Sequence, residues 1–393
     1  MNREQHALLG GSNAARWLAC TPSARLEEKI LAETGDDRET SFSSEGTVAH
    51  SLAESKLLKF LGEDDGGRMD EVQNSQFYNA DMDANIQIYT DYVQTKFAEA
   101  LNKDPEAILR LEQSLDFSNF VPQGFGRGDA VIIADGVMEI IDLKYGRFTP
   151  VVAKDNPQLR LYALGALNDY DWFYNIRTVI MTIVQPRNQG VTSDILLTDS
   201  LKEWGNTVVK PRAILAYDGA GETKAGTHCR FCLAAPRCRA LHDKCMAAKA
   251  IIGKEPQLLS EDELKVCLES GEMLASYLNS VRQYVLDRAL QTGKTLDGYK
   301  VVASRTSASY GDTNAVIERL EKAGYQKKDF MKPSDLIGVT AMKKLLSTRK
   351  FHELLDDLLV KPEGRPTLAP VDDKRPAYDP AEGFTDLDKE TGK

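Results

Sequence analysis

The chain has 393 residues, of which 42% are hydrophobic and 27% are charged, the composition of an ordinary globular protein. This excludes wholesale disorder and a fibrous rod, and no apolar run approaches the roughly 18 residues that a membrane span needs. The charged amino-terminal residues lack the apolar core of a signal peptide, so we expect a cytoplasmic protein. The net charge of −10 excludes a uniformly basic nucleic-acid-binding coat but is compatible with a local basic groove.

The predicted elements of the first two thirds of the chain mix helices with strands. Helical apolar spacing predicts helices over residues 44–61, 80–103, 156–168 and 198–216. Alternating or β-branched apolar runs predict strands over residues 109–117, 128–133, 137–143 and 176–184. This order predicts an α/β fold, with a mixed central sheet flanked by helices and preceded by an N-terminal helical segment.

The last third of the chain predicts a separate small module. Residues 260–292 have the spacing of one or two helices, and a short strand over 299–303 precedes three further helices at 314–323, 342–346 and 351–359. Residues 361–393 are rich in proline and charge, which predicts a disordered tail. We therefore expect a main domain over residues 1–250, an α+β accessory module over 251–360 and a tail over 361–393.

The main chemical signal lies in two short strands joined by a turn. Asp129 stands near the start of the first strand, and Asp142 and Lys144 stand at the end of the second. Because alternate residues of a strand face the same side, Asp142 and Lys144 project together. Asp129 converges on them if the two strands pair as a hairpin. A surface charge pair is the ordinary explanation of Asp-x-Lys, but here the neighbouring residues are apolar, and burying charges without a partner is costly.

Two carboxylates and a lysine suit metal-assisted hydrolysis of a phosphodiester. Mg²⁺ prefers hard oxygen ligands and activates water, while a lysine can position or deprotonate that water and stabilise developing charge. His50, on the helix over 44–61, is a candidate nitrogen ligand, although a lone helical histidine is more often structural. Gln158 and Tyr162 are four residues apart on the next helix, so they share a face and can orient water, phosphate or the lysine.

The cysteines carry a second signal. Cys229, Cys232 and Cys238 form a Cys-x2-Cys-x5-Cys pattern, and three thiols this close in a reducing compartment indicate metal ligation. Candidates for the fourth ligand are Cys20, Cys245, His228 and His242. The spacing alone leaves zinc and an iron–sulfur cluster equally open.

The order of these motifs resembles the RecB-like branch of the PD-(D/E)xK nuclease superfamily. Within that branch it looks like the iron–sulfur nucleases, which include the AddB nuclease domain and the CRISPR-adaptation exonucleases, and it is also similar to an uncharacterised family of phage-encoded proteins. The resemblance covers roughly residues 10–245 and implies a restriction-endonuclease-like core. Asp142 stands where many relatives have glutamate. Glu139 is close by, but strand alternation turns it to the other face, so we do not assign it as a ligand.

The resemblance implies a role for each matching residue. By this resemblance, the ligands of Mg²⁺ or Mn²⁺ would be His50, Asp129, Asp142 and the carbonyl of Leu143. The catalytic residues would be Asp129, Asp142, Lys144, Gln158 and Tyr162, with Lys144 as the catalytic lysine. A [4Fe–4S] cluster would join the two ends of the nuclease domain, with zinc as the alternative occupant. Its ligands would be Cys20, Cys229, Cys232 and Cys238.

The implied activity is that of a Mg²⁺- or Mn²⁺-dependent DNA exonuclease in a bacterial host cytoplasm. It would resect linear duplex DNA, 5′ to 3′, and leave a single-stranded tail for a single-strand annealing protein in phage-type recombination; a homo-oligomer is compatible with this role. One alternative is a non-catalytic DNA-binding scaffold with a degenerate nuclease fold, which the joint presence of Asp129, Asp142 and Lys144 opposes. Another is a zinc-stapled regulatory protein without hydrolytic activity.

Overall fold

The structure, a computed structural model, describes residues 7–34, 41–134, 136–147, 149–188, 190–247, 260–331, 336–361 and 364–378. Contacts divide the chain into two units, Met1–Tyr277 and Leu278–Lys393. The boundary expected at residue 250 lies outside the described residues, and the division by contacts falls within the long helix α11 (Glu261–Thr292). In the described part of the chain, no helix combines the length and the apolarity that crossing a membrane requires.

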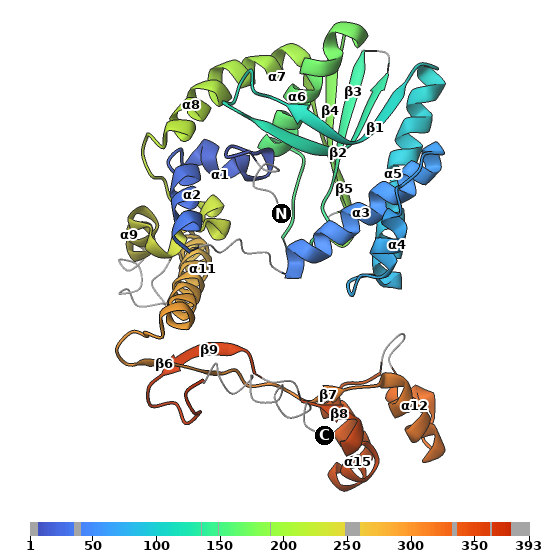
Figure 1. Ribbon diagram of the computed structural model, residues 1–393, viewed down its shortest axis with the longest axis vertical. Helices are drawn as coiled ribbons and strands as arrows, with labels where there is room; N and C mark the ends of the chain where they lie inside the picture. The colour runs from blue at the N-terminus through green and yellow to red at the C-terminus, as the bar shows by residue number, and fades with distance from the viewer. Residues whose placement is uncertain are drawn as a thin grey trace, which may run out of the picture. The chain divides into compact units, whose positions relative to one another are not determined.

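The first unit is built on an open five-stranded sheet with strand order β1-β2-β3-β4-β5 (Figure 1). The strands are β1 (Ile108–Asp116), β2 (Phe125–Ala134), β3 (Val137–Leu143), β4 (Thr178–Gln185) and β5 (Gly190–Leu197). Neighbouring strands pair antiparallel except β3 and β4, which are parallel and are joined through helix α6 (Pro157–Tyr174). The predicted mixed sheet flanked by helices is therefore confirmed.

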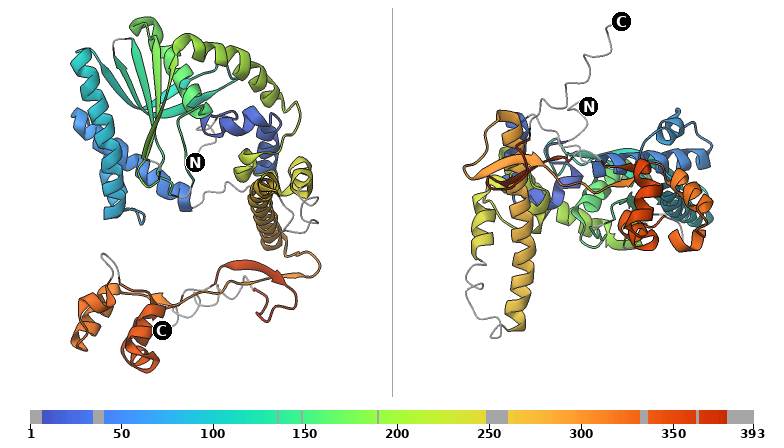
Figure 2. Two further views of the ribbon diagram at one scale, coloured as in Figure 1. Left: turned by 180° about the vertical axis from the view of Figure 1, so that it is seen from behind. Right: turned by 90° about the horizontal axis from the view of Figure 1, so that it is seen from below.

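Helices cover both faces of this sheet, and each face has its own apolar core. Helix α6 packs on one face, where alternate residues of β3 such as Met138 and Ile140 join its core. Helices α3 (Ser41–Leu61) and α5 (Ala80–Lys103) pack on the other face, where Ile141 and Leu143 are buried (Figures 1 and 2). Strand β3 therefore packs against an apolar core on both faces, so its charged residues are buried between apolar neighbours.

The remaining helices of the first unit are shorter. They are α1 (Ala14–Ala19), α2 (Ser23–Thr34), α4 (Arg68–Gln73), α7 (Thr198–Trp204), α8 (Lys210–Asp218) and α9 (Arg239–Ala247). A π-helical turn, Gly205–Val209, joins α7 to α8, so residues 198–216 are helical throughout, as predicted. Helix α6 begins as the sequence predicts, because the Asn156 side chain accepts hydrogen bonds from Gln158 N and Leu159 N and Pro157 fills the first turn.

The second unit contains two small antiparallel ribbons and a helical core. The ribbons pair β6 (Tyr299–Ala303) with β9 (Pro366–Pro370) and β7 (Ser309–Tyr310) with β8 (Leu359–Val360). The helices are α12 (Thr313–Lys322), α13 (Lys327–Phe330), α14 (Val339–Leu346) and α15 (Thr348–Leu355). Phe330, Met342 and Phe351 are fully buried in the core that these helices share.

Two sequence predictions are corrected by these elements. Residues 361–393 were expected to form a disordered tail, but Pro366–Pro370 form strand β9, in which Leu368 pairs with Val301 of β6. Proline is compatible with this strand because β9 has a single strand partner and can leave N–H groups unpaired. Residues 379–393 lie outside the described residues. Strand β5 was not predicted, because its apolar residues are interrupted by Thr192, Ser193 and Asp194.

Candidate metal centre and cysteine cluster

Three carboxylates lie in a row across neighbouring strands. The register pairs Leu111 with Ala130 and Ala130 with Ile141, which places Glu112 of β1 and Asp142 of β3 on either side of Asp129 of β2. Asp129 therefore lies in the middle of a ten-residue strand rather than near the start of a short one, and the predicted hairpin of β2 with β3 is confirmed.

The backbone is distorted along this row. Glu112 has a positive φ of 45°, which is uncommon for a residue with a side chain and costs on the order of 1–3 kcal/mol. The backbone N–H of Leu143 donates to the Asp129 carboxylate, at 2.7 Å from Oδ2. A side chain thus takes the place of a backbone acceptor at the end of β3, and this fixes the orientation of Asp129.

Asp129 is paired with the histidine predicted as a metal ligand. His50 Nδ1 lies 3.2 Å from Asp129 Oδ1, and about one third of the His50 side chain is exposed. Burial disfavours the imidazolium, but the Asp129 carboxylate outweighs it and raises the pKa of His50 to about 9. Burial likewise disfavours the charged form of Asp129, but His50 and Lys144 hold its pKa below the usual value.

Asp142 belongs to a second group of contacts, on the α6 side. Lys144 Nζ lies 2.8 Å from Asp142 Oδ2 and donates to Gln158 Oε1 at 3.1 Å. Gln158 Nε2 donates to Asp142 Oδ1 at 3.3 Å and to the Tyr162 hydroxyl at 3.1 Å. The structure therefore brings the predicted Asp142, Lys144, Gln158 and Tyr162 into one connected network.

The charges of this network are buried and only partly satisfied. Asp142 is 2% exposed, and its Oδ2 has no aligned hydrogen bond although the Lys144 ammonium is close. Burial, reinforced by Asp129 and opposed by Lys144, raises the pKa of Asp142. Burial disfavours the charged form of Lys144, but Asp142 outweighs it and raises the pKa of the ammonium. Lys144 is accordingly protonated at neutral pH.

Two glycines make room for Tyr162, which the sequence reasoning did not anticipate. A Cβ atom built on Gly126 would lie 2.5 Å from Tyr162 Cε1, and the same distance results for a Cβ on Gly11. Gly126 belongs to β2, and Gly11 lies in the short turn before α1. The aromatic ring is thus held between the sheet and the amino-terminal segment, and its hydroxyl is directed at Gln158.

Glu112 is the site residue that sequence reasoning missed. Ligand atoms of His50, Glu112 and Asp129 all lie within 4.8 Å of one another, and in the described part of the chain this is the one such group. Burial, helped by the Asp129 charge, raises the pKa of Glu112 to about 7. The alternating pattern of residues 109–117 marked a strand, but only its pairing with β2 places Glu112 beside Asp129.

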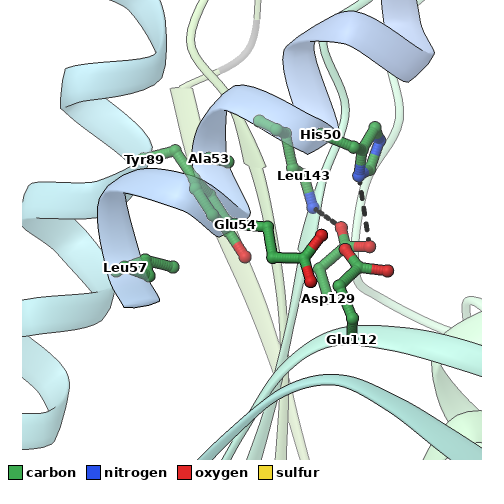
Figure 3. A pocket seen from close by; sticks show the side chains of 8 residues that line it. All are labelled: His50, Ala53, Glu54, Leu57, Tyr89, Glu112, Asp129 and Leu143. Atoms are coloured by element: carbon green, nitrogen blue, oxygen red, sulfur yellow. Dashed lines mark hydrogen bonds and ion pairs between the residues drawn. The ribbon is translucent and has the colours of Figure 1, made fainter. Parts of the chain in front are cut away.

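A small pocket opens on the α3 side of Asp129 (Figure 3). Its lining residues are His50, Ala53, Glu54, Leu57, Tyr89, Glu112, Asp129 and Leu143. Figure 3 shows the carboxylates of Glu54, Glu112 and Asp129 directed toward one another. Leu143 lines the pocket, and the contact that locates it is made by its N–H group. The predicted part of its carbonyl in metal binding stays a prediction.

These residues fit a divalent cation. The donors are carboxylate oxygens with one imidazole, which suits Mg²⁺ or Mn²⁺. Three buried or half-buried carboxylates outnumber the neighbouring cations Lys144 and His50, and Asp142 Oδ2 lacks an aligned donor. Glu139 faces away from Asp142, as strand alternation predicts, and on the α5 side of the sheet it accepts hydrogen bonds from Thr182 and Tyr92.

The cysteine-rich segment lies beside the amino-terminal helices. Lys224 N donates to Cys20 Sγ and Gly226 N donates to Cys229 Sγ, both at 3.4 Å, so one short segment contacts both sulfurs. Cys229, Cys232, Cys238 and the 2% exposed Cys245 pack in one cluster with Ala235 and Leu241. Among the described residues, no three sulfurs meet the 4.8 Å separation that suits a single ion.

Burial, with a contribution from the charge of Glu27, raises the pKa of the Cys232 thiol to about 12, so a bound metal would be needed to make it a thiolate.

Contacts that do not involve sulfur join the amino-terminal segment to α8 and to Ala220 just after it. Three hydrogen bonds, each spanning at least 192 residues, link the start of the unit to its later helices. They run from Thr21 Oγ1 to Ala220 O, from Arg25 Nε to Tyr217 O and from Arg212 to Leu18 O, each at 2.6 Å.

Comparison with known proteins identifies the family of the chain. The family model DUF2800, described as a protein of unknown function, matches residues 6–376, so the chain belongs to this family. Among solved structures, one titled "Crystal structure of SSO0001" is similar at 13% sequence identity, over 55% of this chain and 95% of that chain. Its TM-score is 0.22, and at that value the similarity carries no argument about fold or function.

Proposed function

We propose that this member of the DUF2800 family is a metal-dependent deoxyribonuclease of the RecB-like PD-(D/E)xK type. The observation that carries the proposal is the convergence of Asp129, Asp142 and Lys144, from the paired strands β2 and β3 and the residue after β3, with Gln158 of α6. A bound Mg²⁺ or Mn²⁺ would supply an activated water and neutralise charge on the phosphoryl group. Each short motif is weak by itself, but their joint geometry matches the requirements of phosphodiester hydrolysis.

The side chains of the site have separate roles in the proposed reaction. Asp129 and Asp142 supply oxygen ligands, and His50 supplies a nitrogen ligand from α3. The Lys144 ammonium, which lies 2.8 Å from Asp142 Oδ2, serves as a donor and positive charge that orients water and stabilises the transition state. Gln158 holds the Lys144 ammonium and is itself held by the Tyr162 hydroxyl, so both are positioning residues.

The proposed substrate is linear duplex DNA. By resemblance, the enzyme would degrade one strand from an end, 5′ to 3′, and hand the remaining single strand to an annealing protein. The test is a Mg²⁺- or Mn²⁺-dependent assay on linear and covalently closed duplexes labelled at either end. We expect loss of linear DNA only, with Lys144→Ala reducing the rate about 10³-fold and the exposed Lys103→Ala unchanged. Inactivity on every end structure, in a folded protein that still binds DNA, would leave a non-catalytic scaffold.

We further propose that Cys20, Cys229, Cys232 and Cys238 hold a [4Fe–4S] cluster. Its support is the shared segment that donates to two of the sulfurs and the common packing of the other two. Anaerobically purified protein should be brown and contain inorganic sulfide, and Cys229→Ser should lose both. Stoichiometric zinc without visible absorbance would contradict the cluster and favour a zinc-stapled domain.

A further inference from the structure

A loop without regular secondary structure connects the two halves of the proposed site. Lys144 follows β3, Gln158 lies in the first turn of α6, and the described residues from 145 to 156 form no helix or strand. The Lys144 end is fixed, because its backbone N–H donates to Val184 O of β4 at 2.9 Å. Loops of this kind are usually the most mobile part of a domain. The 3.1 Å contact between Lys144 and Gln158 therefore depends on what holds the loop.

The last residue of β4, Gln185, holds this loop at three points. The residue is fully buried. Its amide nitrogen donates to Gly146 O at 2.8 Å and to Thr149 O at 2.9 Å, and its amide oxygen accepts from Val151 N at 3.1 Å. Buried backbone groups need a hydrogen-bond partner, and here one side chain serves three of them. Gln185 thus takes the part that a neighbouring strand would play for this segment.

Strand β5 holds the rest of the loop. Thr192 Oγ1 accepts from Ala153 N at 3.0 Å, and Asp194 Oδ2 accepts from Asp155 N at 3.1 Å. Thr192 and Asp194 are alternate residues of the strand, so both face the same side, which is the side where Leu196 packs on the α6 core. They are polar residues that interrupt the apolar pattern of β5. The loop that they bind explains their position in the strand.

The contact with Asp194 lies directly before α6. Asp155 has a positive φ of 55°, which is uncommon for a residue with a side chain. Arg160 of α6 pairs with Asp155 and lies 3.4 Å from Asp194 Oδ2, so one carboxylate contacts both the loop and the helix. The next residue, Asn156, caps α6 by accepting from Gln158 N at 3.0 Å. The hydrogen bonds of β5 are therefore linked to the first turn of α6, where Gln158 lies.

We propose that the hairpin of β4 and β5 positions Lys144 and Gln158 by fastening the loop between them, with Gln185, Thr192 and Asp194 as positioning residues. They act through the loop backbone rather than on the reacting atoms. Without these bonds the loop samples other conformations, and Lys144 and Gln158 are in contact for a smaller fraction of the time. Small errors of placement are costly to a reaction rate. The inference rests on the proposed function for its catalytic consequence, whereas the fastening of the loop is independent of it.

The test combines amide hydrogen exchange of residues 145–160 with cleavage kinetics of the full chain. Thr192→Val removes the hydroxyl at nearly constant shape, Thr192→Ser retains it, and Gln185→Met removes the amide. Thr192→Val and Gln185→Met should speed exchange in this segment about ten-fold. They should also lower kcat about 10- to 100-fold, with KM for linear duplex DNA unchanged, while Thr192→Ser behaves as wild type. Thr198→Val is the matched control: its buried hydroxyl donates to Ile176 O at 2.7 Å, outside the loop, so its loss should leave both measurements unchanged.

Four outcomes decide the inference. Exchange as slow as in wild type in both Thr192→Val and Gln185→Met would overturn it, whether or not the protein cuts DNA. Faster exchange with unchanged kcat would overturn the positioning, as would an equal loss of kcat in Thr198→Val, because the loss would then follow stability. Faster exchange that extends to the first turn of α6, in a protein that cuts no DNA, would support the positioning and contradict the nuclease proposal. Urea denaturation monitored by tryptophan fluorescence shows whether each variant is folded, and variants of two different residues test the same loop.

Discussion

Replacing Glu112 with glutamine should make the metal-free protein more stable, not less. The Glu112 side chain is 18% exposed. Its burial, together with the charges of Asp129 and Glu54, raises its pKa from 4.5 to about 7, although His50 and Arg127 oppose this rise. The folded protein therefore holds a carboxylate that would prefer to be protonated. Glutamine has the same shape as the protonated acid and carries no charge to bury.

The size of the effect follows from the pKa. A rise from 4.5 to about 7 corresponds to a cost of about 3 kcal/mol in the free energy of unfolding. Because the pKa of this acid is higher in the folded state than in the unfolded state, the carboxylate costs no stability below pH 4.5. The cost develops as pH rises from 4.5 to about 7 and is complete above that range. Glu112→Gln should therefore add about 3 kcal/mol near pH 8 and less than about 1 kcal/mol near pH 5.

The assay is urea denaturation with a chelator, monitored by tryptophan fluorescence. All three tryptophans, Trp17, Trp172 and Trp204, lie in the unit Met1–Tyr277, so the signal reports the unit that contains Glu112. Saturating Mn²⁺ should then reverse the order of stability, because a ligand stabilises the protein that binds it more tightly. The reasoning is refuted if metal-free Glu112→Gln is less stable than wild type near pH 8, or if its advantage is the same near pH 5.

Four further substitutions test the geometry of the site and of the helix α3 beside it. Gly126→Ala should destabilise the protein by about 1–3 kcal/mol in urea denaturation and lower nuclease activity, because the new Cβ would lie 2.5 Å from the Tyr162 ring. Gly46→Ala should instead stabilise α3 by about 0.5–1 kcal/mol in the same experiment, because a Cβ built on Gly46 has no atom within 4 Å. Gln158→Ala should reduce the cleavage rate about 10- to 100-fold, since Lys144 loses its acceptor. Glu139→Gln should leave the cleavage rate unchanged, because Glu139 faces away from Asp142 and is held by Thr182 and Tyr92; a large loss would show that Glu139 takes part in catalysis.

Much of the fold could be predicted where local patterns decide the structure. The helix over 80–103 and the strand over 137–143 have the predicted bounds, because strong periodicity and clear flanking residues define them. Asp142, Lys144, Gln158 and Tyr162 were found for the same reason, since each pair shares a face by its spacing alone. Asp129 required only the pairing of two adjacent strands, which the turn between them implied.

The features that the sequence did not predict depend on contacts between distant segments. Glu112 becomes a site residue only through the register of β1 on β2, and single-sequence patterns do not fix that register. Tyr89 and Glu54 reach the pocket from helices whose rotation about their axes depends on packing against the sheet. Strand β9 was missed because its prolines match a tail, while its pairing with β6 lies more than 60 residues away in the sequence.

The hydrogen bonds between the amino-terminal helices and α8 also constrain how the protein is made. Leu18, Thr21 and Arg25 have their partners at residues 212–220, so α1 and α2 cannot complete their packing until about 200 more residues have been synthesised. At about 5–20 residues per second, this interval lasts on the order of 10–40 s. During that time Trp17, which is 1% exposed in the folded protein, lacks part of its core and is available to chaperones. Slowing translation before residue 212 should therefore lower the yield of folded protein more than slowing it afterwards.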